Sequence, residues 1–310
     1  MWIQAVVLIV SLLVLAWSAD KFVDGACGVA KFFGLSPFLI GMVIVGFGTS
    51  APEMLVSATS ALEGSPSIAL GNAYGSNIAN IALILGVAAI VNPIKVDKAL
   101  MKKELQFLLL TIPLTVVLIL DGQISRIDAI ILLAVFLVIM VISSLGKKEE
   151  LSEDAENGGK VSIVKSLFLL VMGLTLLISS SKALVWAAQE IAVSLGISEL
   201  IIGLTIVALG TSLPELASSV SAARKNEHEV AFGNVVGSNL FNTLCVVGIA
   251  AAIAPVASDP KILMRDMPVV AVLTLLLFVF AARQKISRIS GVFLVAVYFA
   301  YNTLIALGII

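Results

Sequence analysis

Histidine and cysteine are nearly absent from this chain of 310 residues, which contains one histidine and two cysteines. Cys27 and Cys245 lack the spacing of metal ligands, so we expect both to be unpaired, small apolar side chains. The only histidine, His228, falls in a predicted loop, and neither an H-E-x-x-H motif nor a G-x-S-x-G turn is present. These absences give no support to a hydrolase, and we expect neither enzyme activity nor a bound cofactor.

Charged residues are also scarce. They make up 13% of the chain against 60% hydrophobic residues, and the mean hydropathy is +1.12. The charges cluster between apolar runs, whereas amphipathic soluble helices would alternate them with apolar residues. A helix of about 20 apolar residues crosses the hydrocarbon core of a bilayer. We therefore expect ten membrane spans, near residues 2–19, 37–62, 67–91, 104–120, 127–145, 162–181, 199–223, 230–254, 267–282 and 289–308.

The apolar runs are continuous, whereas a membrane β-barrel would alternate polar and apolar residues over about ten residues per strand. The predicted fold is therefore an all-α integral membrane protein. The ten spans leave no room for a soluble domain.

Two polar motifs interrupt the apolar runs, and each occurs twice. GTSAPEM at residues 48–54 returns as GTSLPEL at 210–216, and GNAYGSN at 71–77 returns as GNVVGSN at 233–239. Both pairs are separated by 162 positions. Chance similarity between two apolar helices would not reproduce both motifs at one offset, so we expect a duplicated unit.

The duplication predicts two halves, residues 1–146 and 161–310, joined by a short linker at 147–160. Residues 38–93 align with 200–255 without a gap. The linker is acidic but lacks the D-x-[DN]-x-[DN]-G spacing of a calcium-binding loop, so we expect a solvated segment.

Lysine and arginine are distributed unevenly among the predicted loops. With the N-terminus outside, four of the 19 basic residues lie in outside loops and the other fifteen inside, which favours this orientation. Both termini are then extracellular and the linker is cytoplasmic. Each half has five spans, an odd number, so the two repeats are predicted to be inverted. The four outside residues are Arg126, Lys182, Lys261 and Arg265.

Glu53 and Glu215 are the only acids that we place near the bilayer centre. An ionised carboxylate there costs roughly 3 kcal/mol on insertion scales, and no lysine or arginine lies in the middle of a predicted span. A cation or a proton must therefore accompany the pair, unless both glutamates are protonated and join helices by hydrogen bonds. Matching breaks with an acid in each half indicate a binding site at the repeat interface of a secondary transporter.

The residues around the two glutamates supply further oxygen ligands. Pro52 and Pro214 should break their helices and free the carbonyl groups near Gly48 and Gly210. Carboxylate, carbonyl and hydroxyl oxygens suit Ca²⁺, Na⁺ or Mg²⁺, and Ca²⁺ tolerates an irregular oxygen cage best. The hydroxyl groups beside the breaks belong to Thr49, Ser50, Thr211 and Ser212.

The second motif adds a hydroxyl and an amide in each half. Ser76 with Asn80, and Ser238 with Asn242, are four residues apart and share a helix face, so we expect them to act as ligands. For Asn72 and Asn234, hydrogen bonding between neighbouring helices is an equal alternative.

At these residues the chain resembles the calcium/cation antiporter superfamily, and within it the prokaryotic sodium/calcium exchangers. The alpha-1 and alpha-2 repeats of that superfamily resemble residues 48–53 with 71–80, and 210–215 with 233–242. The resemblance runs the full length of the chain, and both motifs recur in both halves.

The resemblance implies a site. It implies that Glu53 and Glu215 bind Ca²⁺ and share Na⁺ sites with the motif threonines and serines. The carbonyl groups of Gly46 and Ala208 would be further Na⁺ ligands.

Departures from the superfamily pattern bear on the coupling ion. Proton-coupled members carry an acid where this chain has Gly75 and Gly237, which argues against proton coupling. Potassium-dependent members carry an aspartate at one of the positions of Asn80 and Asn242, so potassium co-transport is not expected.

The expected function is therefore exchange of Na⁺ for Ca²⁺ across the cell membrane by alternating access. Its expected partners are these two ions and the lipid bilayer, with no nucleic acid and no obligate protein partner. Exchange of H⁺ for Ca²⁺ is the alternative within the superfamily, and a cation channel is the alternative outside it, since acidic rings also select cations. We expect the first and sixth spans, which carry few site residues, to slide as a pair.

Overall fold

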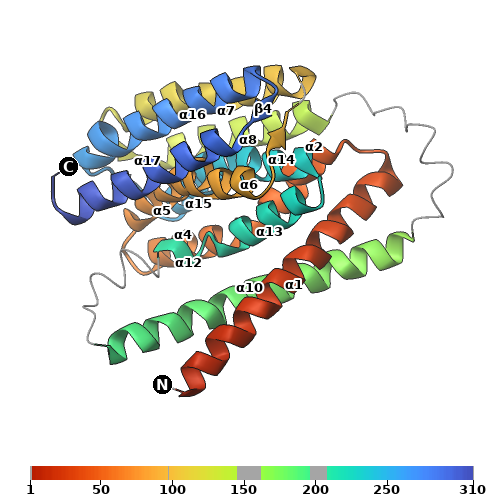
Figure 1. Cartoon of the computed structure of the whole chain (residues 1–310). Coiled ribbons are helices and arrows are strands. Elements are labelled where there is room, and N and C mark those ends of the chain that lie inside the picture. Colours follow the sequence, from red (N-terminus) through yellow and green to blue (C-terminus); the bar gives the residue numbers. More distant parts are fainter. Residues whose placement is uncertain (1, 97, 145–161, 196–207, 310) are drawn as a thin grey trace.

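The computed structural model describes every residue except 1, 97, 145–161, 196–207 and 310 (Figure 1). Long helices make up nearly all of the described chain, which confirms the all-helical membrane fold. Within the described ranges, seven helices are long and apolar enough to cross a membrane, or eight when one bent pair is taken as a single span. The count of ten spans stays a prediction. The linker at 147–160 and residues 199–207 of the span expected at 199–223 lie outside the described ranges.

The first half contains the following elements: α1 (Trp2–Phe33), α2 (Pro37–Ile40), the π-helical segment η1 (Gly41–Val45), α3 (Gly46–Thr49), α4 (Ala51–Leu62), α5 (Ile68–Ile78), the π-helical segment η2 (Ala79–Ile84), α6 (Leu85–Val91), β1 (Ile94–Lys95), α7 (Lys98–Ile119), β2 (Gln123–Ile124) and α8 (Arg126–Ser144).

The second half contains α10 (Ile163–Ser194), α12 (Ala208–Gly210), α13 (Leu213–Arg224), α14 (His228–Leu240), the π-helical segment η4 (Phe241–Val246), α15 (Val247–Ile253), β3 (Val256–Ala257), the π-helical segment η5 (Ile262–Asp266), α16 (Met267–Ala282), β4 (Lys285–Ile286) and α17 (Arg288–Ala306).

The first and sixth spans are longer than predicted. We expected them to end near residues 19 and 181, but α1 continues to Phe33 and α10 to Ser194. Charged residues that follow the apolar run of α1 do not stop the helix, because they retain good helix propensity. The stop comes from Gly34, which has φ 63°, and from the bond that the Leu35 N–H donates to the Ala30 carbonyl.

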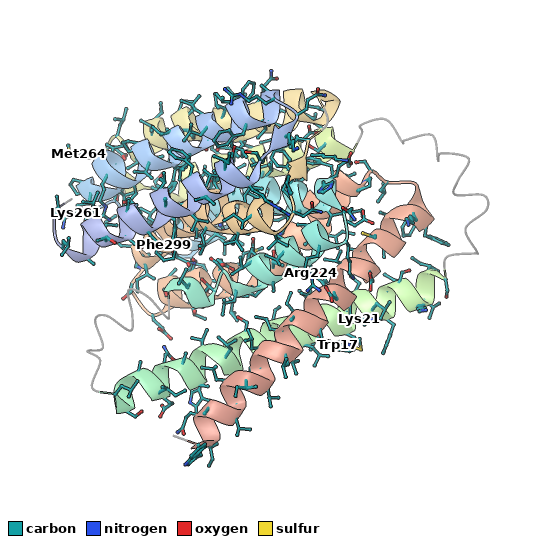
Figure 2. All side chains as sticks on the ribbon, in the orientation of Figure 1. Trp17, Lys21, Arg224, Lys261, Met264 and Phe299 are labelled. Carbon is teal, nitrogen blue, oxygen red and sulfur yellow. The ribbon has the colours of Figure 1, made fainter. Side chains whose placement is uncertain are left out.

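Helices α1 and α10 cross each other in a layer on one side of the remaining helices (Figure 1). Glycines allow the crossing to be close: a Cβ atom on Gly25 would collide with the backbone of Leu170, and one on Gly173 with the backbone of Phe22. Trp17 and Lys21 lie on α1 (Figure 2), and the Lys21 ammonium is 5.9 Å from the centre of the Trp17 ring.

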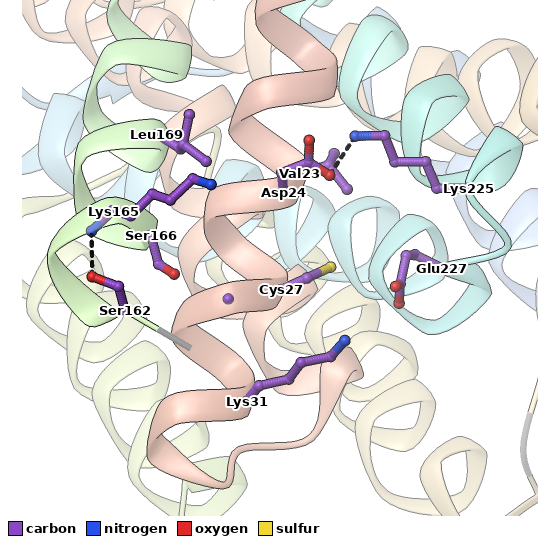
Figure 3. A pocket seen from close by; sticks show the side chains of 11 residues that line it. Val23, Asp24, Cys27, Lys31, Ser162, Lys165, Ser166, Leu169, Lys225 and Glu227 are labelled. Atoms are coloured by element: carbon purple, nitrogen blue, oxygen red, sulfur yellow. Dashed lines mark hydrogen bonds and ion pairs between the residues drawn. The ribbon is translucent and has the colours of Figure 1, made fainter. Parts of the chain in front are cut away.

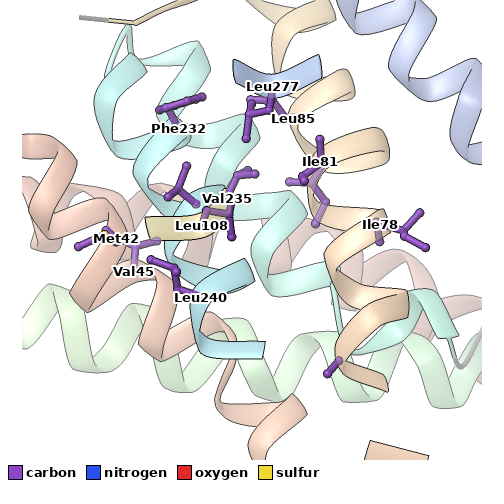
Figure 4. Packing of buried hydrophobic residues seen from close by; sticks show 14 of the residues in the cluster. Met42, Val45, Ile78, Ile81, Leu85, Leu108, Phe232, Val235, Leu240 and Leu277 are labelled. Carbon is purple, nitrogen blue, oxygen red and sulfur yellow. The ribbon is translucent and has the colours of Figure 1, made fainter. Parts of the chain in front are cut away.

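The continuous helices α5–η2–α6 and α14–η4–α15 form the centre of the bundle and carry the second polar motif of each half. Apolar side chains around them are closely packed (Figure 4): Met42 and Val45 of η1 lie against α14 near Val235. Glycines again permit close approach, since a Cβ atom on Gly237 would collide with the backbone of Met42. The central helices therefore bring the motifs of both halves to one place.

Four two-residue strands, absent from the prediction, connect the halves. β1 pairs with β4 through Ile94 with Ile286, and β2 pairs with β3 through Ile124 with Val256, both antiparallel. Adding the repeat offset of 162 to Ile94 gives Val256, and subtracting it from Ile286 gives Ile124, so one pair is the repeat equivalent of the other. The two ladders are therefore related as the two contacts of a two-fold interface would be.

Candidate cation-binding site

Both helices that carry the first motif are broken where the prolines predicted. In the first half, α3 ends at Thr49 and α4 begins at Ala51, with a bend of 43° between the two parts. In the second half, α12 ends at Gly210 and α13 begins at Leu213. Each proline is the second residue of the helix after the break, where it needs no N–H donor.

The two glutamates lie in the first turns of α4 and α13 and are fully buried, with exposed fractions of 0% for Glu53 and 1% for Glu215. The positive end of a helix dipole favours a negative charge at this position. Ser50 and Ser212 precede them by three residues, the spacing of a capping box. Neither serine caps its helix through its side chain, so these hydroxyl groups are available to other partners.

Ser50 uses its hydroxyl across the repeat interface. It donates to Glu215 Oε1 at 3.3 Å. The Glu53 carboxyl correspondingly lies near Thr211 and Ser212 of the other half, although neither forms a hydrogen bond of regular geometry with it. Each carboxylate therefore faces the broken helix of the opposite half.

Further hydrogen bonds join side chains of the two halves in the same region. They link a residue of the first motif with one of the second, and residues of the two central helices with one another. The bonds are Thr49 Oγ1 to Asn234 Oδ1 (3.1 Å), Asn77 Nδ2 to Thr243 Oγ1 (2.8 Å) and Asn80 Nδ2 to Asn239 Oδ1 (3.2 Å).

Asn72 and Asn234 hold the glutamate-bearing helices. Asn72 Nδ2 donates to the Glu53 carbonyl at 3.2 Å and to the Ser57 hydroxyl at 3.0 Å. Asn234 Nδ2 repeats the pattern with the Glu215 carbonyl at 3.4 Å and Ser219 at 2.8 Å. Sequence reasoning left the role of these asparagines open and passed over Ser57 and Ser219. The signal was present, because each serine follows its glutamate by one helical turn.

A group of buried oxygen atoms in this cluster accepts no hydrogen bond from the described residues. Buried polar atoms without partners are costly and rare in folded proteins. Their concentration at one place provides hard ligands, although the amide nitrogens of Asn239 and Asn242 also lack partners there. The atoms are both carboxyl oxygens of Glu53, Oε2 of Glu215, Oδ1 of Asn77, Asn80 and Asn242, and the hydroxyl oxygens of Ser212 and Ser238.

The carboxylates also lack a basic partner. In the part of the chain that the structure describes, the ion pairs join Lys225 to Asp24 and Arg265 to Asp266, and neither involves Glu53 or Glu215. The negative charge of the cluster is thus not neutralised by lysine or arginine.

Asn80 and Asn242 occupy the second positions of η2 and η4, two π-helical segments at equivalent places in the repeats. A π-helical segment inserts an extra residue into the helical turn and is often found at functional sites. Both asparagines are buried, as are Ser76 and Ser238. The π segments thus redirect the helix at the residues where we expected amide ligands.

The remaining expected ligands lie at the breaks. Thr211 is in the turn between α12 and α13, and Ala208 begins α12. Gly46 begins α3, and its carbonyl accepts the Ser50 N–H at 3.0 Å. The same carbonyl accepts from the Thr49 hydroxyl at 3.4 Å, so a cation at Gly46 would compete with this long bond for the second lone pair.

Two larger cavities lie away from the carboxylates. One of about 450 Å³ is apolar and extends from Gly48 between Phe22, Phe136 and Phe241. The other, of about 400 Å³, lies between α1, α10 and the α13–α14 turn (Figure 3). Neither is lined by Glu53 or Glu215, whose side chains are buried in the cluster described above.

Comparison with known proteins gives full-length matches. Residues 3–145 and 165–307 both match the family model described as sodium/calcium exchanger protein. The putative antiporter CaxA of Alkalimonas amylolytica is 38% identical over 98% of this chain and 99% of its own length. The sodium/calcium exchanger MaX1 of Methanosarcina acetivorans is 30% identical over 96% of this chain and 97% of its own.

Solved structures of the sodium-calcium exchanger NCX_Mj match the fold. One, soaked with Na⁺ and no Ca²⁺, superposes with a TM-score of 0.86 at 36% identity and covers 99% of both chains. Others were soaked with Na⁺ together with Ca²⁺ or Sr²⁺ and match equally well.

Proposed function

The chain belongs to the sodium/calcium exchanger protein family, and from this premise we propose that it exchanges Na⁺ for Ca²⁺ across the cell membrane by alternating access. Membership of the family makes it a multi-pass membrane antiporter for cations. The identity of the coupling ion, the ligands and the orientation in the membrane belong to the proposal.

The observation that carries the proposal is the pair of buried carboxylates, Glu53 and Glu215, on opposite halves. Oxygen atoms without hydrogen-bond donors surround them, and no lysine or arginine of the described residues pairs with them. Two negative charges match one Ca²⁺, and the neutral hydroxyl, amide and carbonyl oxygens complete the six to eight ligands that Ca²⁺ takes.

The charge of the pair also explains exchange. Ca²⁺ and several Na⁺ compete for overlapping oxygen ligands, so that the two kinds of ion occupy the site by turns. An empty site leaves two unpaired carboxylates buried, and this desolvation cost opposes return of the unloaded protein. Transport in one direction is thereby tied to transport in the other.

The orientation follows from the distribution of basic residues, with both termini extracellular and the linker at 147–160 cytoplasmic. Five predicted spans in each half make the repeats inverted. The two β ladders are repeat equivalents of each other, which supports this arrangement because a two-fold axis relates the halves of an inverted repeat.

Proton coupling is the competing proposal. It is disfavoured by Gly75 and Gly237, which offer no carboxyl group at the positions where proton-coupled members of the superfamily carry an acid. A cation channel would conduct ions continuously, whereas the duplicated broken helices favour a carrier.

The test is uptake of radioactive Ca²⁺ into liposomes that contain the purified protein. We expect uptake to require an outward Na⁺ gradient. Loss of one charged ligand worth about 3 kcal/mol lowers the rate about 100-fold, so Glu53→Gln and Glu215→Gln should abolish most of the flux. Glu190→Gln, an exposed acid on α10, is the matched control and should transport normally.

Uptake driven by a pH gradient without Na⁺ would mean that the coupling ion is H⁺ and not Na⁺. Normal exchange by Glu53→Gln would refute the proposed site. Absence of Ca²⁺ flux under either gradient would refute Ca²⁺ as the transported ion.

A further inference from the structure

Charged residues join α1 to α13 at the end of α13, outside the candidate site. The Lys225 ammonium donates to Asp24 Oδ1 and to the Asp20 carbonyl, both at 2.6 Å, and the Ser221 hydroxyl donates to the Asp20 carboxylate. Asp20 and Asp24 are one helical turn apart on α1, as are Ser221 on α13 and Lys225 at its C-cap. Figure 3 shows the Asp24–Lys225 ion pair at the edge of the cavity beside α10. We name these four residues the first latch.

The repeat offset maps the first latch onto a second set of residues with reversed charges. Asp20 corresponds to Lys182 on α10, and Lys225 corresponds to Glu63 at the end of α4. The hydroxyl of Ser221 corresponds to that of Thr59. An acid on the crossing helix and a lysine on the broken helix are thus replaced by a lysine and an acid. Asp24, the ion-pair partner of Lys225, corresponds to Trp186, so in the second set the attractive contact would lie between Lys182 and Glu63 alone.

The offset applies to this region as it does to the motifs. Buried Leu15 and Ser18 of α1 correspond to buried Leu177 and Ser180 of α10. The Ser18 hydroxyl donates to the Leu15 carbonyl at 3.0 Å, and the Ser180 hydroxyl donates to the Leu177 carbonyl at 3.1 Å. The match of Asp20 with Lys182 is therefore a structural correspondence.

Only the first latch is closed in this structure. Glu63 and Lys182 are both exposed, and no ion pair joins them among the described residues. Helix α1 packs along α13, whereas α10 makes no comparable packing along α4. The layer of α1 and α10 is thus held against one half of the bundle and separated from the equivalent surface of the other half.

The position of Glu63 is not explained by the stability of α4. Glu63 is the C-cap residue, where the negative end of the helix dipole disfavours an acid, whereas Lys225 at the C-cap of α13 is favoured. A cationic partner for Glu63 would offset this cost, and Lys182 corresponds to Asp20, whose backbone carbonyl accepts from Lys225.

We propose that Asp20, Asp24, Ser221 and Lys225 on one face, and Thr59, Glu63 and Lys182 on the other, are positioning residues that close alternately in the transport cycle. The first latch holds one side shut in the state seen here, and the Glu63–Lys182 pair forms when the layer of α1 and α10 moves to the other side. This inference rests on the exchange function proposed above. The side chains of Lys225 and Asp24 are 28% and 43% exposed, and partly exposed ion pairs are weak enough to break in each cycle.

Cysteine pairs test the alternation directly. Asp20→Cys with Ser221→Cys, and Thr59→Cys with Lys182→Cys, are introduced separately into a chain in which Cys27 and Cys245 are replaced by alanine. Because the side chains of Asp20 and Ser221 touch, the first pair should form a disulfide in the state seen here. The second pair should form a disulfide only in the other state, because Thr59 and Lys182 do not pair in the state seen here. Each disulfide should stop Ca²⁺ exchange until it is reduced.

Charge exchange tests the pair that is open in this structure. Lys182→Glu alone and Glu63→Lys alone place like charges together and should slow exchange about two- to fivefold, the effect of a partly exposed ion pair. The double variant Glu63→Lys with Lys182→Glu should recover the wild-type rate. Arg224→Gln changes an exposed charge next to Lys225 (Figure 2) and should leave the rate unchanged.

Failure of the Thr59–Lys182 disulfide to form under any combination of Na⁺ and Ca²⁺, together with no recovery in the double variant, would overturn the proposal. Formation of both disulfides in the same molecule would also overturn it. Disulfide formation is read on a gel without transport, so a protein that proved to carry other ions would fail the flux assay and still answer this question.

Discussion

At the scale of single residues, the site is defined by groups that lack partners. Glu53 and Glu215 are buried without a basic neighbour in the described chain, and several oxygen atoms around them accept no hydrogen bond. Such a cluster destabilises the folded protein unless a ligand occupies it. In the proposed function this cost is the counterpart of cation binding and release, which require ligands without other partners.

Neutralising a glutamate should therefore stabilise the cation-free protein. We expect Glu53→Gln or Glu215→Gln to raise the free energy of unfolding by about 1–3 kcal/mol in a buffer without Na⁺ or Ca²⁺, because a buried unpaired charge is removed. Ca²⁺ should stabilise the wild type by about 2.7 kcal/mol at 100 times its dissociation constant, and should stabilise the variants far less. Thermal unfolding of the detergent-solubilised protein measures both effects.

Glu190→Gln, which changes an exposed acid, should leave unfolding unchanged with and without Ca²⁺. Variants of Glu53 that lose stability in the absence of cations would mean that the carboxylate is held by hydrogen bonds and is not waiting for a cation.

At the scale of elements, close helix contacts place the two motifs together. The η1 segment of the first half packs against α14 of the second, and the absence of side chains at Gly41, Gly233 and Gly237 permits the approach. This contact lies beside Asn234, which bonds to Thr49 and to the Glu215 carbonyl. Glycine therefore sets the distance between the broken helix of one half and the central helix of the other.

Gly237→Ala should show this dependence. The added methyl group collides with the Met42 backbone, and we expect a loss of about 1–3 kcal/mol, as for other overpacked cores. The repeat-equivalent change Gly75→Ala meets no described residue within 4 Å and should stabilise its helix by about 0.5–1 kcal/mol. Thermal unfolding of the two variants compares them, and equal losses would contradict the assigned contact.

At the scale of the whole molecule, the described chain divides into a crossing layer of α1 and α10 and a bundle that contains the site (Figure 1). We predicted from the sequence that the first and sixth spans slide as a pair, and that motion stays a prediction. Their close contact through Gly25 and Gly173 is compatible with movement as one unit.

Joining α1 to α10 should therefore preserve transport. A Cβ atom at residue 28 would lie 2.9 Å from Ser166 Cβ, so the variant Gly28→Cys with Ser166→Cys should form a disulfide within the layer once α1 and α10 separate by about 1 Å at this crossing. If the layer moves as a unit, Ca²⁺ flux in liposomes should change by less than about twofold before and after reduction. The Asp20–Ser221 disulfide, which joins the layer to the bundle, is the matched comparison and should stop flux. Inhibition by both would mean that α1 and α10 move relative to each other.

The sequence alone determined the membrane fold, the duplication and the residues of the candidate site. Hydropathy and helix breaking depend on local sequence. No tertiary contact is needed to recognise the two prolines, the paired glutamates and the motif spacing. The family match confirms the resemblance, while ligation by the named residues stays a prediction. The predicted ends of the first and sixth spans were wrong, because polar residues do not stop a helix that packs against a neighbouring helix.

Only the tertiary structure decided which half each side chain serves. Ser50 bonds to Glu215 and Thr49 to Asn234, while β1 pairs with β4, and no local signal distinguishes these contacts from contacts within one half. The same holds for the latch, since Asp20 and Lys225 are 205 positions apart. Such pairings depend on how helices distant in sequence pack around one another, and that packing is settled by the shape of the whole molecule.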